Sequence, residues 1–228
     1  DACLVGSEMC IRDRFKIVWS ARSECGPNRE KNEDSIHPTK SGSANPPFKA
    51  AVCDGLGGHI NGDIASKIAV NTLIDHTHDL NKLINNANNK ILEYQNENPK
   101  SIGMGTTMTA ITINDDGLMK IGHVGDSRCY VYSDRNLVKV TEDQNVPGYQ
   151  NVLKQALGSN EKIKIYEIDF QLKIGDVVLL CSDGLYNEIG DEYIKKKMQD
   201  GISAESLVSE VLLLNPKDNV SAIVINLI

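Results

Sequence analysis

Short β-rich runs recur along almost the whole chain, and they constrain its fold more than any other feature. Apolar and β-branched residues cluster in brief stretches separated by Gly, Asn and Asp. The predicted strands are residues 15–21, 48–53, 107–113, 119–124, 128–133, 137–141, 162–170, 177–182 and 220–228. Turn-forming residues at 116–117, 134–136 and 174–176 predict hairpins between successive strands. The sheets are therefore expected to be antiparallel.

Two long helical stretches interrupt the strands. Residues 62–75 place Ile64, Ile68 and Leu73 on one helical face, and residues 80–96 repeat this amphipathic pattern. Shorter helices are predicted at 191–199 and 204–214, the second with Ser203 as its N-cap. Hairpins and helices in separate groups differ from the strict alternation of a parallel α/β fold, so we predict an α+β sandwich with its helices on the outside.

Composition narrows the class of protein. The 228 residues are 40% hydrophobic and 24% charged, which suits one sizeable globular domain. The formal net charge is -7, and Lys195, Lys196 and Lys197 form the main basic run, so no nucleic-acid partner is expected. No apolar run approaches the roughly 18 residues of a membrane helix, and the cysteines show no CxxC pair. We expect a cytoplasmic protein with no membrane partner.

The first 14 residues fit no element of this pattern. The string from Leu4 to Arg14 resembles one reading frame of a transposase-based sequencing adaptor. Residues 1–14 are therefore expected to be non-native, and residues 15–228 to form a single catalytic domain. Resequencing the locus would refute this interpretation if it found these codons in the genome.

Three aspartates follow or precede strands in the same local form, as Asp54-Gly55, Asp183-Gly184 and Asp218-Asn219. Each pair alone is also typical of an ordinary turn. Carboxylates gathered at the end of a sheet repel one another unless a cation neutralises them. Oxygen ligands without a zinc-type His/Cys set favour Mg²⁺ or Mn²⁺. Glu33, Asp34 and Asp126 would add further carboxylates.

A series of segments in this order resembles the metal-dependent protein phosphatases of type 2C, in a compact bacterial form. These segments are REKNEDS (29–35), DGLGGH (54–59), GMGTT (103–107), HVGDSR (123–128), TEDQN (141–145), NVLKQALG (151–158), LLCSDGL (179–185) and DNVSA (218–222). One such segment would be weak evidence, but their order over residues 29 to 222 makes the resemblance strong. It implies two packed antiparallel sheets with helices on both outer faces.

The resemblance also implies the roles of individual residues. Asp54 would bridge two Mg²⁺ or Mn²⁺ ions, and Arg29 would bind the substrate phosphate. The implied metal site consists of Glu33, Asp34, Asp54, the Gly55 carbonyl, Asp126, Asp183 and Asp218. Within it, Asp126 and Asp183 would hold a third, weaker ion. Two such ions lower the pKa of a shared water and direct it at phosphorus.

The implied function is a serine/threonine protein phosphatase that acts, as a monomer, on the phosphorylated substrates of a kinase. A pseudophosphatase retained as a regulatory binding module is one alternative, although all five principal carboxylates are present. A two-metal phosphodiesterase is another, but its polyanionic substrate would favour a more basic chain.

The sequence departs from the family pattern at three places. Leu56 stands where some relatives have a histidine proposed as general acid, which leaves His59 or a water as the proton donor. The segment between Asp143 and Ala156 is short, which implies a reduced flap, a more open site, weaker peptide selectivity and a weaker third ion. Gln144 replaces a usual histidine with no assigned consequence. Thr106 and Thr107 are expected to support the fold.

Overall fold

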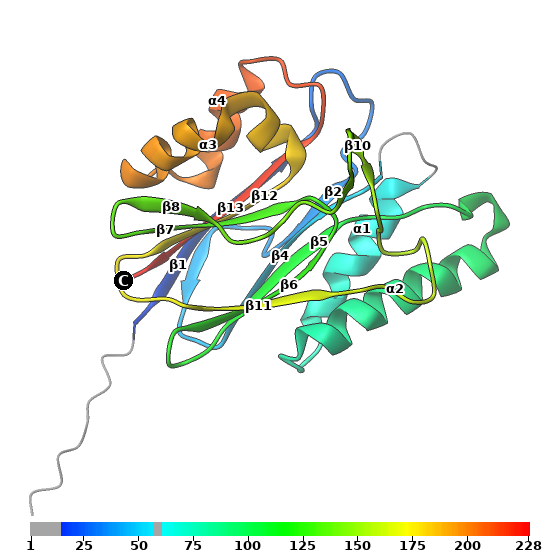
Figure 1. The fold of residues 1–228 in the computed structure, drawn as a ribbon, viewed down its shortest axis with the longest axis horizontal. Helices are drawn as coiled ribbons and strands as arrows, with labels where there is room; N and C mark the ends of the chain where they lie inside the picture. Colours follow the sequence, from blue (N-terminus) through cyan, green and yellow to red (C-terminus); the bar gives the residue numbers. More distant parts are fainter. Residues whose placement is uncertain (1–14, 57–60) are drawn as a thin grey trace, which may run out of the picture.

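The computed structural model describes residues 15–56 and 61–228. In this part of the chain, two antiparallel sheets pack face to face, with helices on the outer side of each (Figure 1). The predicted α+β sandwich is therefore confirmed. The segment 1–14, and with it the adaptor interpretation, lies outside the described residues, as does His59.

The first sheet has six strands, all antiparallel to their neighbours. In spatial order they are β3 (Gly42–Ala44), β1 (Ile17–Glu24), β13 (Val220–Leu227), β12 (Val177–Cys181), β7 (Arg128–Ser133) and β8 (Asn136–Lys139). Cys181 of β12 lies opposite Ala222 of β13, so the end of β12 meets the start of β13. This pairing brings Asp183 and Asp218 to the same end of the sheet.

The second sheet has five antiparallel strands. They are β11 (Tyr166–Gln171), β6 (Leu118–Val124), β5 (Met108–Ile113), β4 (Phe48–Asp54) and β2 (Asp34–His37). A separate two-stranded hairpin, β9 (Asn145–Val146) and β10 (Tyr149–Leu153), projects from the sandwich (Figure 1).

Each sheet buries its outer face under a helical pair. Helices α1 (Gly62–Asn71) and α2 (Leu80–Glu97) pack on the second sheet, and the short 3₁₀ helices η1 (Thr72–Ile74) and η2 (Pro99–Ser101) follow them. Helices α3 (Asp183–Gln199) and α4 (Ala204–Leu212) pack on the first. The predicted N-cap is confirmed, because the Ser203 hydroxyl accepts a hydrogen bond from the Ser206 amide at 3.2 Å.

Strand β13 shows why the sequences of the strands are nearly continuous runs of apolar residues. Ile223, Ile225 and Leu227 enter the core between the sheets, whereas Ala222 and Val224 pack beneath α3 and α4. A strand buried on both faces needs apolar residues at every position rather than at alternate ones.

One predicted connection is wrong. The turn at 174–176 was expected to close a hairpin, but it carries the chain from β11 in the second sheet to β12 in the first. The turns at 116–117 and 134–136 do join paired strands, β5 to β6 and β7 to β8. A turn signal marks where the chain reverses, not which sheet receives the next strand.

Helix α3 begins at Asp183, well before the predicted start at residue 191, and has a break at Gly190, whose φ is 67°. The residues that precede this break include the Asp183-Gly184 pair, which therefore opens a helix and not a turn. None of the helices in the described ranges combines the length and apolar character that crossing a membrane requires.

Candidate metal centre and substrate pocket

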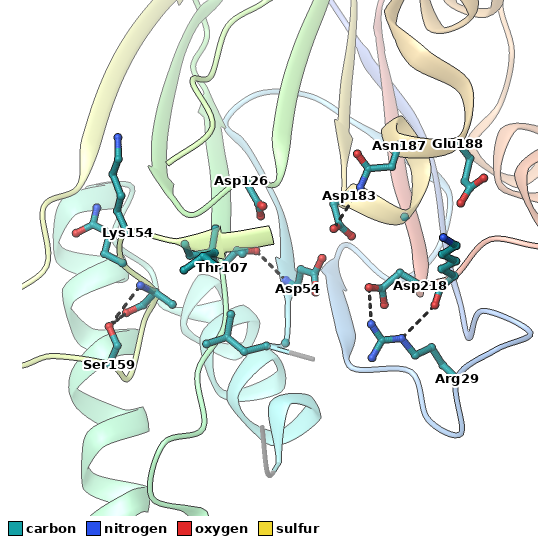
Figure 2. A pocket seen from close by; sticks show the side chains of 18 of the residues that line it. Arg29, Asp54, Thr107, Asp126, Lys154, Ser159, Asp183, Asn187, Glu188 and Asp218 are labelled. Atoms are coloured by element: carbon teal, nitrogen blue, oxygen red, sulfur yellow. Dashed lines mark hydrogen bonds and ion pairs between the residues drawn. The ribbon is translucent and has the colours of Figure 1, made fainter. Parts of the chain in front are cut away.

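Both sheets end at a pocket of about 740 Å³. Asp54 is the last residue of β4, Asp183 is the first of α3, and Asp218 lies just before β13. Asp126 joins them from the turn between β6 and β7. Figure 2 shows the carboxylates of these aspartates around the middle of the pocket. The three aspartates singled out in the sequence therefore meet, although none of their elements are consecutive in the chain.

Asp34 does not line the pocket but lies behind it. It pairs with Asp54 across β2 and β4, and its side chain is buried. Its Oδ2 accepts hydrogen bonds from the hydroxyls of Ser182, at 2.7 Å, and Ser221, at 2.6 Å. The sequence analysis missed these two serines. Their places next to Asp183 and near Asp218 were the available signal.

Glu33 also lies outside the pocket lining, next to Gly55. Its carbonyl oxygen accepts a hydrogen bond from the Gly55 amide at 3.1 Å, and its own amide donates to Asn219 Oδ1 at 2.9 Å. A Cβ on Gly55 would lie 2.5 Å from the Gly62 backbone and 2.7 Å from the Glu33 carbonyl oxygen. Only glycine permits this approach of β4 to the start of α1.

Burial and mutual repulsion make these carboxylates resist ionisation. Burial raises the pKa of Asp34 to about 6, against the hydrogen bonds from Ser221 and Ser182. Burial and the negative charge of Asp218 raise the pKa of Asp183 to about 7. Burial and the charges of Asp34 and Asp183 raise the pKa of Asp54 well above its ordinary value. Burial likewise raises the pKa of Asp126.

These residues fit divalent cations. Oδ1 of Asp34 and Oδ1 of Asp183 are buried and have no hydrogen-bond partner among the described residues. Such oxygens are costly unless a positive charge compensates them, and an all-oxygen donor set suits Mg²⁺ or Mn²⁺. In residues 15–56 and 61–228, however, no three acidic, His or Cys side chains converge closely enough to form a ready-made ion site.

Arg29 is paired with one of the candidate metal ligands. Its guanidinium donates to Asp218 Oδ2 at 2.5 Å and, through Nε, to the Lys217 carbonyl oxygen at 3.3 Å. Both side chains are about one-third exposed and line the pocket. A candidate metal ligand and a candidate phosphate-binding group therefore lie side by side at the pocket.

An arginine and a tyrosine hold the turn that carries Asp126. The Tyr186 hydroxyl donates to the Asp126 carbonyl oxygen at 3.1 Å, and the Arg128 guanidinium lies over the Tyr186 ring, 3.5 Å from its centroid. Arg128 also binds both oxygens of Asp143, at 2.6 and 3.0 Å. Because Tyr186 belongs to the first turn of α3, this contact couples the Asp126 turn to the helix that begins with Asp183.

Tyr186→Phe should lower the free energy of unfolding by about 0.5–1.5 kcal/mol, since it removes one hydrogen bond and keeps the ring under Arg128. Tyr186→Leu should cost at least about 0.5–1 kcal/mol more, because the cation–π contact is also lost. Urea denaturation monitored by circular dichroism measures both. Equal stability of the Phe variant and the wild type would show that the hydroxyl contributes nothing.

The structure shows what Gln144 does. Its buried side chain accepts hydrogen bonds from the Gly125 amide at 3.0 Å and from Gln155 Nε2 at 2.9 Å. Gln144 thus joins the Asp126 turn to the pocket wall. The threonines bind Asp54 through its backbone, since Thr107 Oγ1 lies 2.9 Å from the Asp54 amide and Thr106 Oγ1 donates to its carbonyl oxygen at 2.8 Å. They support the strand end, as expected.

Comparison with known proteins agrees with this architecture. The family model described as protein phosphatase 2C matches residues 25–216. The chain belongs to the protein phosphatase 2C family. It is 29% identical over 240 residues to the serine/threonine protein phosphatase PstP of Mycobacterium tuberculosis, across 93% of this chain and 45% of PstP. The chain thus spans about half the length of that relative.

A shorter relative and two solved structures extend the comparison. The serine/threonine phosphatase stp of Listeria monocytogenes is 28% identical over 240 residues, which cover 90% of this chain and 93% of stp. The M. tuberculosis PstP structure superposes with a TM-score of 0.83 at 28% identity, across 93% of this chain and 99% of that one. The PstP catalytic domain in complex with two manganese ions gives 0.82 at 28% identity, with 94% and 99% covered.

Proposed function

We propose that this protein is a metal-dependent serine/threonine protein phosphatase that hydrolyses phosphoserine and phosphothreonine monoesters. The observation that carries the proposal is the convergence of Asp54, Asp183 and Asp218 at one pocket beside Arg29. Membership of the protein phosphatase 2C family supports the same activity. The manganese complex of the PstP catalytic domain supports two Mn²⁺ or Mg²⁺ ions as the cofactors.

The chain's own residues have separate tasks. Asp54, Asp183 and Asp218, with Glu33 and the Gly55 carbonyl, would hold the two principal ions, and Asp34 would hold a water bound to one of them. Asp126 with Asp183 would hold a weaker third ion. When bound, the ions supply a nucleophilic water of lowered pKa and positive charge opposite the phosphate oxygens. Ser182 and Ser221 fix the orientation of Asp34. Arg29 binds the phosphate through paired guanidinium donors, which remain charged at any working pH.

The proposed substrates are proteins that a serine/threonine kinase has phosphorylated. The enzyme is proposed to act on them as a monomer, in the cytoplasm. Cys53, Cys129 and Cys181 are free and buried, which is compatible with a reducing compartment. Residues 15–228 are proposed to act as one catalytic domain, because the two sheets share one core.

The activity is tested by measuring phosphate release from a phosphothreonine peptide after treatment with EDTA, and again after Mn²⁺ or Mg²⁺ is added. The proposal expects release only with the added ion. Folded protein that releases no phosphate under either condition would indicate the pseudophosphatase alternative. Hydrolysis of bis(p-nitrophenyl) phosphate without hydrolysis of the peptide would indicate the phosphodiesterase.

Arg29→Ala should lower kcat/KM for p-nitrophenyl phosphate about 10- to 100-fold, because charge-assisted hydrogen bonds contribute about 1.5–3 kcal/mol. Inhibition by inorganic phosphate should weaken in parallel. The matched control is Arg22→Ala, since Arg22 is exposed to the same extent but pairs with Glu24 away from the pocket. Equal kinetics of the two variants would remove Arg29 from phosphate binding.

A further inference from the structure

The pocket extends beyond the metal-site carboxylates, and its two ends differ in charge. Arg29 lies at one end and Lys154 at the other, with Asp54 between them (Figure 2). The Arg29 end also contains Lys217 and Glu188, which carry opposite charges. At the Lys154 end, the other lining residues are uncharged: Val152, Leu153, Gln155, Ala156, Ser159 and Asn160.

No carboxylate among the described residues forms an ion pair with Lys154. It is exposed, and in the part of the chain that the structure describes its side chain forms neither an ion pair nor a hydrogen bond. In a chain whose formal net charge is -7, an unpaired lysine at the edge of the substrate pocket is available to a ligand.

The backbone that carries Lys154 is held in place relative to the carboxylates. The Lys154 amide donates to the Gln144 carbonyl oxygen at 2.7 Å, and the Gln144 side chain holds the Gly125 amide beside Asp126. Gln155 is held on its other side, where its Oε1 accepts from the Lys164 amide at 2.9 Å.

A second link runs to Asp54. Leu157 and Thr106 exchange backbone hydrogen bonds of 2.9 and 3.2 Å, and the Thr106 hydroxyl donates to the Asp54 carbonyl oxygen. The wall from Lys154 to Leu157 is therefore attached both to the turn of Asp126 and to the strand end of Asp54. The backbone of Lys154 therefore has a fixed position relative to Asp54, at the edge of the pocket.

We propose that Lys154 recognises an acidic residue flanking the phosphorylated serine or threonine, so that the enzyme prefers acidic phosphopeptides. This inference rests on the proposed function and names its substrate class. Lys154 directly follows the β9–β10 hairpin in the pocket lining, and its ammonium supplies the charge that selects an acidic side chain.

Three phosphothreonine peptides test the proposal, identical except that the residues flanking the phosphothreonine are Glu, Ala or Lys. With Mn²⁺, wild-type kcat/KM should be about three- to tenfold higher for the Glu peptide than for the Lys peptide, as expected for one partly exposed ion pair. The ratio should shrink at high NaCl, because salt screens exposed charges.

Charge reversal assigns the effect to Lys154. Lys154→Glu should abolish or invert the Glu-to-Lys ratio and leave the rate on p-nitrophenyl phosphate within about twofold. The matched control is Lys162→Glu, which makes the same charge change at an exposed lysine outside the pocket lining and should leave the ratio as in the wild type.

Other outcomes would overturn either the role of Lys154 or the proposed function. Equal wild-type rates on the three peptides, or equal effects of the two charge reversals, would overturn the role of Lys154 while leaving the phosphatase activity intact. A similar loss on p-nitrophenyl phosphate and all peptides would also overturn it, since Lys154 would then bind the phosphate itself. Absence of hydrolysis of every substrate, p-nitrophenyl phosphate included, would instead refute the proposed function.

Discussion

Asp54→Asn is expected to reduce kcat/KM by about a thousandfold or more in the presence of Mn²⁺, and to weaken Mn²⁺ binding in a direct titration. Asp54 is the residue that would bridge the two ions, and an amide has no negative charge to hold them together. The neutral amide also removes repulsion from Asp34 and Asp183, which face the same carboxylate. The variant should therefore fold, as circular dichroism can verify.

A control with the same local sequence is available in this chain. Asp116-Gly117 is also an aspartate before a glycine, but it forms the exposed turn between β5 and β6. Asp116→Asn should keep full activity and Mn²⁺ affinity. If Asp54→Asn retained more than about a tenth of the wild-type kcat/KM, a bridging role for Asp54 would be untenable.

Asp183→Asn is expected to stabilise the metal-free protein at pH 8 by about 2–4 kcal/mol and to have little effect near pH 4. Burial and Asp218 raise the pKa of Asp183 to about 7 in the folded protein, whereas an aspartate in an unfolded chain titrates near about 3.9. At pH values between these two pKa values, Asp183 is protonated in the folded state and ionised in the unfolded state. The free energy of unfolding therefore falls as the pH rises through this window.

Asparagine does not ionise, so the free energy of unfolding of the variant does not fall for this reason as the pH rises. One opposing effect is smaller: Asp183 lies in the first turn of α3, where a negative charge gains about 0.3–1 kcal/mol from the helix dipole. Both proteins share every other titrating group, including the buried His123, so the difference between their unfolding curves reports the charge of Asp183 and its repulsion of the neighbouring carboxylates.

The measurement is urea denaturation in EDTA at several pH values from 4 to 8, repeated with Mn²⁺. Saturating Mn²⁺ at about 100 times its Kd should stabilise the wild type by about 2.7 kcal/mol, and the variant less, since it lacks one proposed ligand. The stability advantage of the variant should therefore shrink when the ion is added. A constant difference between the two proteins at all pH values would contradict the raised pKa.

The strands were largely predictable because their residues are buried on one or both faces. Strand β7 matches its predicted range, and β4, β5, β6, β12 and β13 differ from theirs by one residue at an end. Strands β2 and β3 were missed because they are short and carry Asp34, Ser35 and Gly42 in place of an apolar pattern. They are strands because a neighbouring strand supplies their hydrogen bonds, which no local pattern records.

The candidate site also has features that the sequence predicted and features that it did not. The acidic residues were recognisable from short motifs, but the serines that bind Asp34 and the contact between Tyr186 and Arg128 were not. Those contacts join residues far apart in the chain, and a hydroxyl beside an aspartate in the sequence does not show which carboxylate it will meet. The charge difference between the two ends of the pocket was invisible for the same reason.

The sequence by itself determined the fold class, the identities of the carboxylates and the family resemblance, because strand periodicity and motif order are local properties of the chain. Only the tertiary structure decided which sheet each strand joins, which carboxylates share one pocket, and that Arg29 pairs with Asp218. Those features depend on the antiparallel pairing of β12 with β13 and on the packing of one sheet against the other, which bring distant residues within hydrogen-bonding and Coulombic range.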